Sequence, residues 1–189
     1  MSSRILVEGE SDKVFIEALI EHLQKDIEVD SPVCSAGECE LMNGKDDLKK
    51  KLEAIKRDAR KHGIDKVGII LDANSVGIDQ REIEIQEKIL QVFGRNPDVL
   101  FLTYIINIDG AGELETLLKA VKSEDSFYAD CLNAFQDCLP SDKKLTRKEF
   151  DKLWVYNYQK EDCNSSELDQ MYNFDNTLLN DLKDFLNQL

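Results

Sequence analysis

Two carboxylates near the start of the chain stand where a strand is expected to give way to a helix. The apolar residues 4–7 predict a buried strand, and Glu8 and Asp12 follow it on either side of Gly9. Beyond Asp12, apolar residues recur every three or four positions, which predicts a helix over residues 11–24. Ligands of open α/β sheets bind at the carboxyl ends of the strands. Acids at such a place indicate that a cation is bound there or that a proton is transferred.

Acids also follow the later strands that the sequence predicts. Asp72 ends the third apolar run, and Asp109 follows the fourth and most apolar run, shortly before Glu113 and Glu115. If the strands are parallel, their ends meet at one edge of the sheet. The carboxylates then repel one another unless a cation binds or a proton neutralises one of them. Hard oxygen ligands of this kind suit Mg²⁺ or Mn²⁺.

Each acid also has a purely structural interpretation. Asp72 would cap the turn that follows it. Asp12, Glu113 and Glu115 would interact favourably with the dipole at the start of a helix. In a chain with 38 Asp and Glu residues, acids flank strands by chance as well. Their recurrence at several strand ends is what favours a shared site.

The apolar pattern along the chain predicts an α/β fold. Apolar runs alternate with amphipathic helices up to residue 106, which is typical of a mainly parallel sheet covered on both faces. We expect about four strands, at residues 4–7, within 27–34, at 67–71 and at 99–106. We expect helices between them at residues 11–24, 45–62 and 83–93, and loops at 35–44 and 74–79.

The character of the chain changes after residue 108. The later segments fit helices or loops, at residues 113–121, 127–139, 147–158 and 176–189, although residues 153–158 also fit a fifth strand. We therefore expect an α/β domain over residues 1–122 and a helical C-terminal extension, residues 123–189, packed on it.

The charge of the chain bears on its partners. A formal net charge of −14 over 189 residues argues against a general nucleic-acid-binding surface. Residues 45–66, however, carry nine Lys or Arg against five acids. Lys49, Lys50 and Arg57 of this stretch are candidates for contacts with a phosphate backbone, and so is Lys160 near the C-terminus. A solvated helix face is the other interpretation of the basic stretch.

Cysteine content and hydropathy indicate the compartment. The five cysteines make an odd number without a paired framework, which predicts reduced thiols. We expect Cys131 and Cys138 to share one helical face and to pack as small core residues. The sequence has no run of eighteen apolar residues, so we expect no membrane-spanning helix. The first predicted strand begins so early that we expect no signal peptide before it. We expect a cytoplasmic protein with no membrane partner.

Two motifs resemble a known domain. Val7-Glu8-Gly9-Glu10-Ser11-Asp12 after the first strand and Leu71-Asp72-Ala73-Asn74 after a later one resemble the Toprim domain of topoisomerases, primases and overcoming-lysogenization-defect (OLD) nucleases. That domain has a glutamate after its first strand and an Asp-x-Asp after a later one. The chain also resembles a stand-alone bacterial family of Toprim-related proteins, in which a segment like residues 110–115 follows the fourth strand. The resemblance is clearest over residues 4–120 and implies a Toprim-like, Rossmann-like sheet.

The resemblance also implies a role for each matching residue. Glu8 matches the general acid/base or metal-binding glutamate, and Asp12 matches the second acid of the OLD-type variant. Asp72 matches the first metal-binding aspartate. Glu115 matches the acid after the fourth strand, with Glu113 as its competitor for that role.

Asn74 departs from the pattern, which has aspartate at this position. Its amide offers a carbonyl oxygen but no charge, so the expected affinity for a metal falls.

Two functions from different classes remain open. The first is a Mg²⁺- or Mn²⁺-dependent nuclease, or a related phosphotransfer enzyme, acting on DNA or RNA. In it, Glu8 and Asp72 are catalytic, and the metal ligands are Glu8, Asp12, Asp72, Asn74 and Glu115. The second is a catalytically degenerate Toprim-like module that binds a protein partner or a second copy of the chain. The retained acids favour the first function, whereas Asn74 and the negative charge favour the second.

Overall fold

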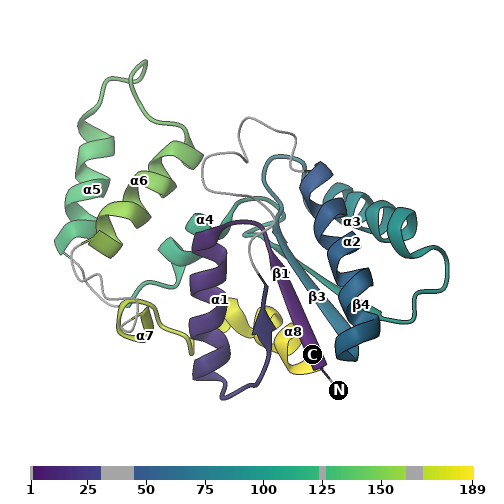
Figure 1. The fold of residues 1–189 in the computed structure, drawn as a ribbon. Coiled ribbons are helices and arrows are strands. Elements are labelled where there is room, and N and C mark those ends of the chain that lie inside the picture. Colours follow the sequence, from purple (N-terminus) through teal and green to yellow (C-terminus); the bar gives the residue numbers. More distant parts are fainter. Residues whose placement is uncertain (1, 31–44, 124–126, 161–167) are drawn as a thin grey trace.

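A four-stranded parallel sheet lies at the centre of the molecule (Figure 1). The computed structural model describes residues 2–30, 45–123, 127–160 and 168–189. The strands are β1 (Ser2–Val7), β2 (Glu28–Val29), β3 (Ile64–Asp72) and β4 (Leu100–Ile106), in the order β2-β1-β3-β4. This arrangement confirms the expected α/β fold with a parallel, Rossmann-like sheet flanked by helices.

Helices connect the strands and make up the chain after β4. They are α1 (Glu10–His22), α2 (Lys45–His62), α3 (Ile78–Phe93), α4 (Leu114–Ala120), α5 (Phe127–Cys138), α6 (Arg147–Lys160), α7 (Leu168–Met171), the 3₁₀ helix η2 (Thr177–Leu179) and α8 (Asn180–Gln188). Within the part of the chain that the structure describes, none of these helices is long and apolar enough to cross a membrane.

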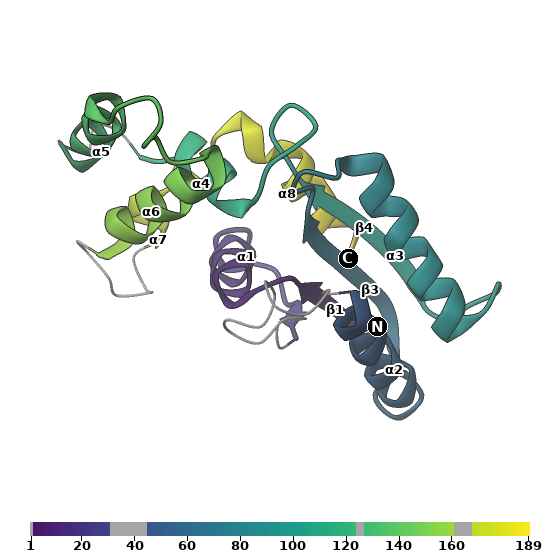
Figure 2. The ribbon, with the colours of Figure 1, turned by 90° about the horizontal axis from the view of Figure 1, so that it is seen from above.

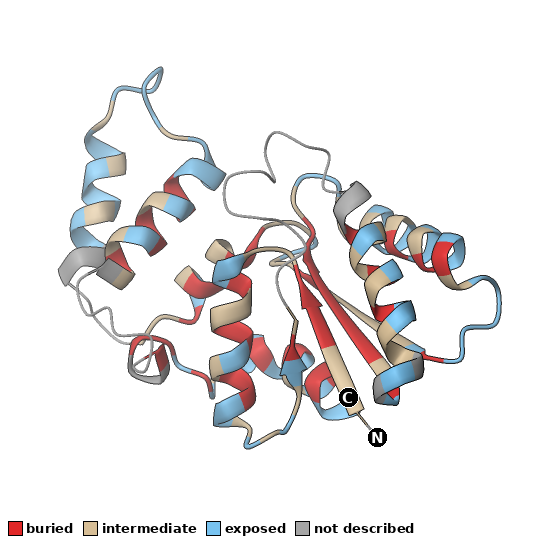
Figure 3. Cartoon of the chain, viewed as in Figure 1, coloured by how far each residue is buried: buried red, intermediate tan, exposed pale blue. Residues whose placement is uncertain are grey.

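The two faces of the sheet carry different helices, as Figure 2 shows. Successive side chains of a strand point to opposite faces. In β1, Leu6 therefore packs with α2 and α3, whereas Ile5 and Val7 pack in a larger core with α1 and the helices that follow β4. Figure 3 shows the resulting buried strands and the buried inner sides of the helices around them.

The C-terminal helix returns to the sheet. Tyr104 of β4 contacts Phe185 of α8, with ring centroids 5.7 Å apart, and Ser3 Oγ donates to the Leu189 carbonyl at 2.6 Å. Gly68 of β3 makes room for this helix, because a Cβ atom there would lie 2.7 Å from Leu189 Cδ1 and 3.1 Å from Phe185 Cζ. Elements from both ends of the sequence thus share one core, and the predicted domain boundary at residue 122 stays a prediction.

Two expectations from the sequence were wrong in detail. Helix α3 begins at Ile78, inside the expected loop, because Gly77 with φ of 84° starts the helix early. The helix expected at residues 147–158 is confirmed as α6, and the alternative strand at 153–158 is excluded, because Trp154 and Tyr158, one helical turn apart, stack in the core with ring centroids 4.7 Å apart. The expected loop at 35–44 falls outside the described residues.

The second error concerns two cysteines. Cys131 and Cys138 are exposed on α5 and do not pack in the core. Among residues 130–140, whose side chains the structure describes, only Leu132, Gln136 and Leu139 are half-buried, and the two cysteines lie outside this stripe. Figure 3 shows α5 as the most exposed of the helices.

Replacing Gly68 tests how closely α8 packs on β3. We expect Gly68→Val to lower the free energy of unfolding by about 1–3 kcal/mol, because the new side chain enters filled space. Chemical denaturation measures the loss. Combining it with Leu189→Ala should recover part of the stability, since Leu189 is the nearest neighbour. A Gly68→Val variant as stable as wild type would contradict this packing.

Candidate acidic site at the carboxyl edge of the sheet

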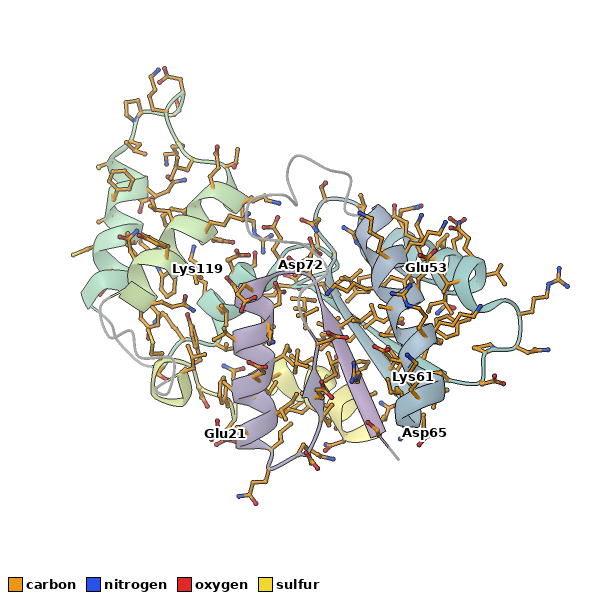
Figure 4. The ribbon with its side chains drawn as sticks, viewed as in Figure 1. Glu21, Glu53, Lys61, Asp65, Asp72 and Lys119 are labelled. Carbon is orange, nitrogen blue, oxygen red and sulfur yellow. The ribbon has the colours of Figure 1, made fainter. Side chains whose placement is uncertain are left out.

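Pairing of the two central strands places the first two acids. Val7 of β1 lies opposite Ile70 of β3, so Glu8 emerges beside the end of β3, where Asp72 is the last residue. Glu8 Oε2 accepts a hydrogen bond from the Asp72 backbone amide at 3.2 Å. Figure 4 shows Asp72 at the carboxyl end of β3 and Asp65 near the amino end of the same strand. The parallel register therefore joins these two acids, as expected.

Asp12 completes the start of α1 and is almost fully buried. Its Oδ2 accepts a hydrogen bond from the Gly9 amide at 3.0 Å, which caps the helix. A Cβ atom on Gly9 would lie 3.1 Å from that oxygen, so glycine leaves room for the carboxylate. Asp12 Oδ1 is buried without a hydrogen-bond partner among the described atoms. Buried polar atoms are nearly always paired, so this oxygen calls for an explanation.

The segment after β4 brings the remaining acids to the same edge. Asn74 and Gly112 exchange backbone hydrogen bonds of 2.8 and 3.3 Å, which ties the end of β3 to the start of α4. Gly112 has a φ of 112°, a conformation that favours glycine. The Leu114 amide then donates to Asp72 Oδ1 at 3.0 Å. Glu113 and Glu115 flank Leu114 and so reach the site.

Burial and mutual repulsion change how these acids titrate. Burial, followed by the charge of Glu8, raises the pKa of Asp12 to about 7, although the Gly9 amide acts in the opposite direction. Burial is also the main cause that raises the pKa of Asp72, and the charges of Asp12, Glu8 and Glu115 add to it. Burial raises the pKa of Glu115 as well. The protonation of Asp12 and of Asp72 therefore depends on the charges of the neighbouring acids.

Asn74 has a local structural role at this edge. Its backbone adopts a left-handed conformation with φ of 49°, which asparagine tolerates well. In the amide orientation that satisfies both ends, its nitrogen donates to Glu113 Oε1 and its oxygen accepts from Arg81 Nη2, both at 3.2 Å. An aspartate here would place a further negative charge against Glu113. The departure from the Toprim pattern therefore removes one repulsive contact.

Lys148 is a functional candidate that the sequence prediction missed. From α6 its Nζ contacts Glu113 Oε1 at 2.9 Å, although 35 residues separate the two in the chain. Burial would lower the pKa of this ammonium group, but the hydrogen bond to Glu113 and the charges of Glu113, Asp72 and Glu115 outweigh it and raise the pKa. The adjacent basic residues at the start of the helix were the only signal in the sequence.

The other predicted residues lie elsewhere. Lys49, Lys50 and Arg57 are on α2, which begins on the carboxyl-edge side of the sheet (Figure 1), and the last two are exposed. The side chain of Lys160 falls outside what the structure describes. Within the described ranges, no three His, Cys, Asp or Glu side chains form a ready ligand set for a metal ion. The structure thus gathers Glu8, Asp12, Asp72 and Glu115 at one edge without arranging three of them around a single point.

The fold and site define an α/β protein whose parallel sheet carries a buried acidic group at its carboxyl edge. The chain belongs to the DUF3226 family, described as "Protein of unknown function", and the sequence model of that family matches residues 2–189. No curated protein and no solved structure matches the chain.

The raised pKa of Asp12 makes a prediction about stability and pH. The folded protein holds this proton more tightly than the unfolded chain, in which an aspartate has a pKa of about 3.9. The stability that this contributes is complete below pH of about 4 and is lost as the pH rises through the folded pKa. In EDTA at pH 8, Asp12→Asn should therefore melt higher than wild type, by about 2–4 °C for each kcal/mol regained.

Thermal melting at pH 5 and pH 8 measures this difference. The control is Asp26→Asn, which changes an exposed aspartate and should follow wild type at both values. If the Asp12→Asn advantage is the same at both pH values, titration of Asp12 does not account for it.

Proposed function

We propose that the protein binds Mg²⁺ or Mn²⁺ at this acidic edge and acts as a Toprim-like nuclease, or a related phosphotransfer enzyme, on DNA or RNA. The observation that carries the proposal is Asp12, a buried carboxylate with one unpartnered oxygen inside a group of mutually repelling acids. A bound cation would give that oxygen a partner and remove the repulsion.

The chemistry of the donors fits such an ion. Carboxylate oxygens suit Mg²⁺, which commonly uses only one or two protein carboxylates and keeps several water molecules. A ready set of three side chains is therefore not required. Glu8, Asp12, Asp72 and Glu115 would share the ligand role. Asn74 is left out of the proposed set because Glu113 and Arg81 occupy its amide.

The residues of the chain have separate tasks in the proposed reaction. When bound, the divalent ion supplies stabilisation of the negative charge that develops on the phosphoryl group. Glu8 is half-buried and accepts a hydrogen bond from the Asp72 amide, so its carboxylate is held in place to take a proton from the attacking water. Asp72 is held by the Leu114 amide. Lys148 would leave Glu113 and contact a phosphate oxygen of the substrate.

The substrate must approach a strongly acidic protein. Two basic groups of α6 lie against the acids, since Lys148 contacts Glu113 directly and Lys152 interacts electrostatically with Glu115. Lys49 and Lys50, in the first two turns of α2, are the proposed contacts on the opposite side, and Arg57 lies about 12 Å further along the helix. Counterion release at such contacts supplies the affinity.

We also propose that the protein works in the cytoplasm. Two of its cysteines, Cys131 and Cys138, are exposed free thiols, which suits a reducing compartment.

A second candidate is a Toprim-like module that binds a partner but has lost catalysis. The contacts at Asn74 and Lys148 favour it, because the Lys148 ammonium group balances the charge of Glu113 and the Asn74 amide donates a hydrogen bond to it without any metal. Partners in this case would be another protein or a second copy of the chain. Metal binding and cleavage, measured separately, distinguish the two functions.

Metal binding should raise the melting temperature. Saturation to about 100 times the dissociation constant adds about 2.7 kcal/mol of stability. We therefore expect 10 mM Mg²⁺ or Mn²⁺ to raise melting by several degrees and Glu8→Gln to remove most of the shift. Differential scanning fluorimetry measures it. Glu10→Gln, an exposed neighbour with the same loss of charge, is the matched control. An unchanged melting temperature for wild type would speak against the metal site.

Cleavage should depend on the same acids. With Mn²⁺, we expect wild type to cut single- or double-stranded DNA or RNA, and Glu8→Gln to slow it by about a hundredfold or more. Asp72→Ala should be inactive, whereas Asp109→Asn, which changes an exposed acid nearby, should be active. Cleavage that survives Asp72→Ala would refute the assignment of the site. Metal binding without any cleavage would favour the non-catalytic module.

A further inference from the structure

A cavity of about 650 Å³ lies between α4, α5 and α6, next to the acidic site. We call it the α4–α6 cavity. Its volume is in the range of small-ligand sites, which run from about 300 to 1,000 Å³. It is lined by three charged residues, Lys119, Arg147 and Asp151, and by five uncharged ones. Figure 4 shows Lys119 on α4, away from Asp72 and toward the C-terminal helices.

The charged lining carries more positive than negative charge. Asp151 is almost fully buried and receives a hydrogen bond from Thr116 Oγ1 at 2.9 Å. Lys119 Nζ lies 3.1 Å from Asp151 Oδ1, and Arg147 Nε lies 3.7 Å from Oδ2. One carboxylate thus faces two cations, so the lining has a net charge of +1. The lining is thus locally positive although the protein as a whole has a net charge of −14.

The two cations are held differently. Lys119 Nζ lies 4.1 Å from the centre of the Phe150 ring as well as against Asp151, so the site fixes its position. The Arg147 side chain is 61% exposed, and its 3.7 Å contact with Asp151 is long. Arg147 is therefore free to turn toward a ligand in the cavity, whereas Lys119 is held against Asp151 and the Phe150 ring.

The cavity and the acidic site share two helices. On α6, Arg147 lines the cavity and the next residue, Lys148, contacts Glu113. On α4, Thr116 lines the cavity and the preceding residue, Glu115, belongs to the acidic group. The two helices that carry the acids and Lys148 thus also line the cavity.

We propose that the α4–α6 cavity binds a phosphate group of the nucleic-acid substrate through Arg147 and Lys119. This rests on the proposed function, which it deepens by naming where the strand is held. The guanidinium group of arginine matches phosphate with two parallel hydrogen bonds, and lysine adds a point charge. An apolar ligand would have to bury both cations, which is unfavourable.

Binding of a short single-stranded DNA oligonucleotide tests the proposal. Fluorescence anisotropy is recorded in Ca²⁺, for wild type and for Arg147→Gln, with Arg95→Gln as the matched control. Arg95 is exposed in the loop before β4, at the other edge of the sheet, and its replacement makes the same change of charge. Arg147→Gln should weaken binding about tenfold and reduce the salt dependence by roughly 0.7 in slope. Arg95→Gln should bind as wild type does.

A second variant changes the affinity in the opposite direction. Asp151→Asn removes the negative charge from the lining and should tighten binding of the same oligonucleotide. Competition distinguishes the source of the phosphate: inorganic phosphate that displaces the oligonucleotide from wild type only at high millimolar concentration supports a strand as the ligand. Displacement at micromolar concentration would overturn the assignment to nucleic acid.

The proposal is overturned if wild type binds no oligonucleotide, or if Arg147→Gln binds as tightly as wild type. The magnesium-induced melting shift of wild type, measured in the same series, separates this result from the fate of the proposed function. Loss of oligonucleotide binding in Arg147→Gln without any magnesium shift in wild type would support the cavity and refute the metal site. A magnesium-induced melting shift in wild type, together with unaltered oligonucleotide binding in Arg147→Gln, would support the metal site and refute the cavity.

Discussion

Repulsion among carboxylates held at the end of a parallel sheet is the constraint around which this molecule is organised. The Asp72 amide and Glu8 join the ends of β1 and β3, and the Asp72 side chain in turn holds the start of α4. Each of these contacts brings another acid inward, with Asp12 buried beside them. A fold that needed only stability would place apolar residues there, because isolated buried charges are expensive. This acidic edge is therefore the part of the fold on which the proposed binding of a cation rests.

The helices that follow β4 supply part of that charge from within the chain. α6 carries Lys148 toward Glu113 and Arg147 toward the buried Asp151, so its two neighbouring cations face two different acids. Trp154 and Tyr158, further along the same helix, anchor it in the main core. The same packing that fixes α6 thus fixes the distance between the basic groups and the acidic edge. Asn74 also reduces the repulsion at this edge, because its amide donates a hydrogen bond to Glu113 where an aspartate would add a negative charge.

Local patterns in the sequence were enough to predict the sheet and the acids of the site, but not Lys148. Apolar runs marked the strands, and the parallel arrangement followed from the helices between them. Glu8, Asp12 and Asp72 could be placed together because each stands at the end of such a run. Lys148 could not, because its contact depends on how α6 packs across α4. The exposed cysteines of α5 show the same limit, since a helical pattern does not say which face of the helix packs against the core.

Trp154 is the single tryptophan of the chain, and its surroundings give the molecule an optical property. The indole is fully buried, stacks on Tyr158, and its Nε1 has no hydrogen-bond partner among the described atoms. Its emission should therefore lie at the blue end of the indole range. Because Trp154 stands on the helix that carries Arg147 and Lys148, any tilt of that helix would alter how the indole packs in the core that α6 shares with other elements. The protein contains its own spectroscopic reporter of the element that faces the acids.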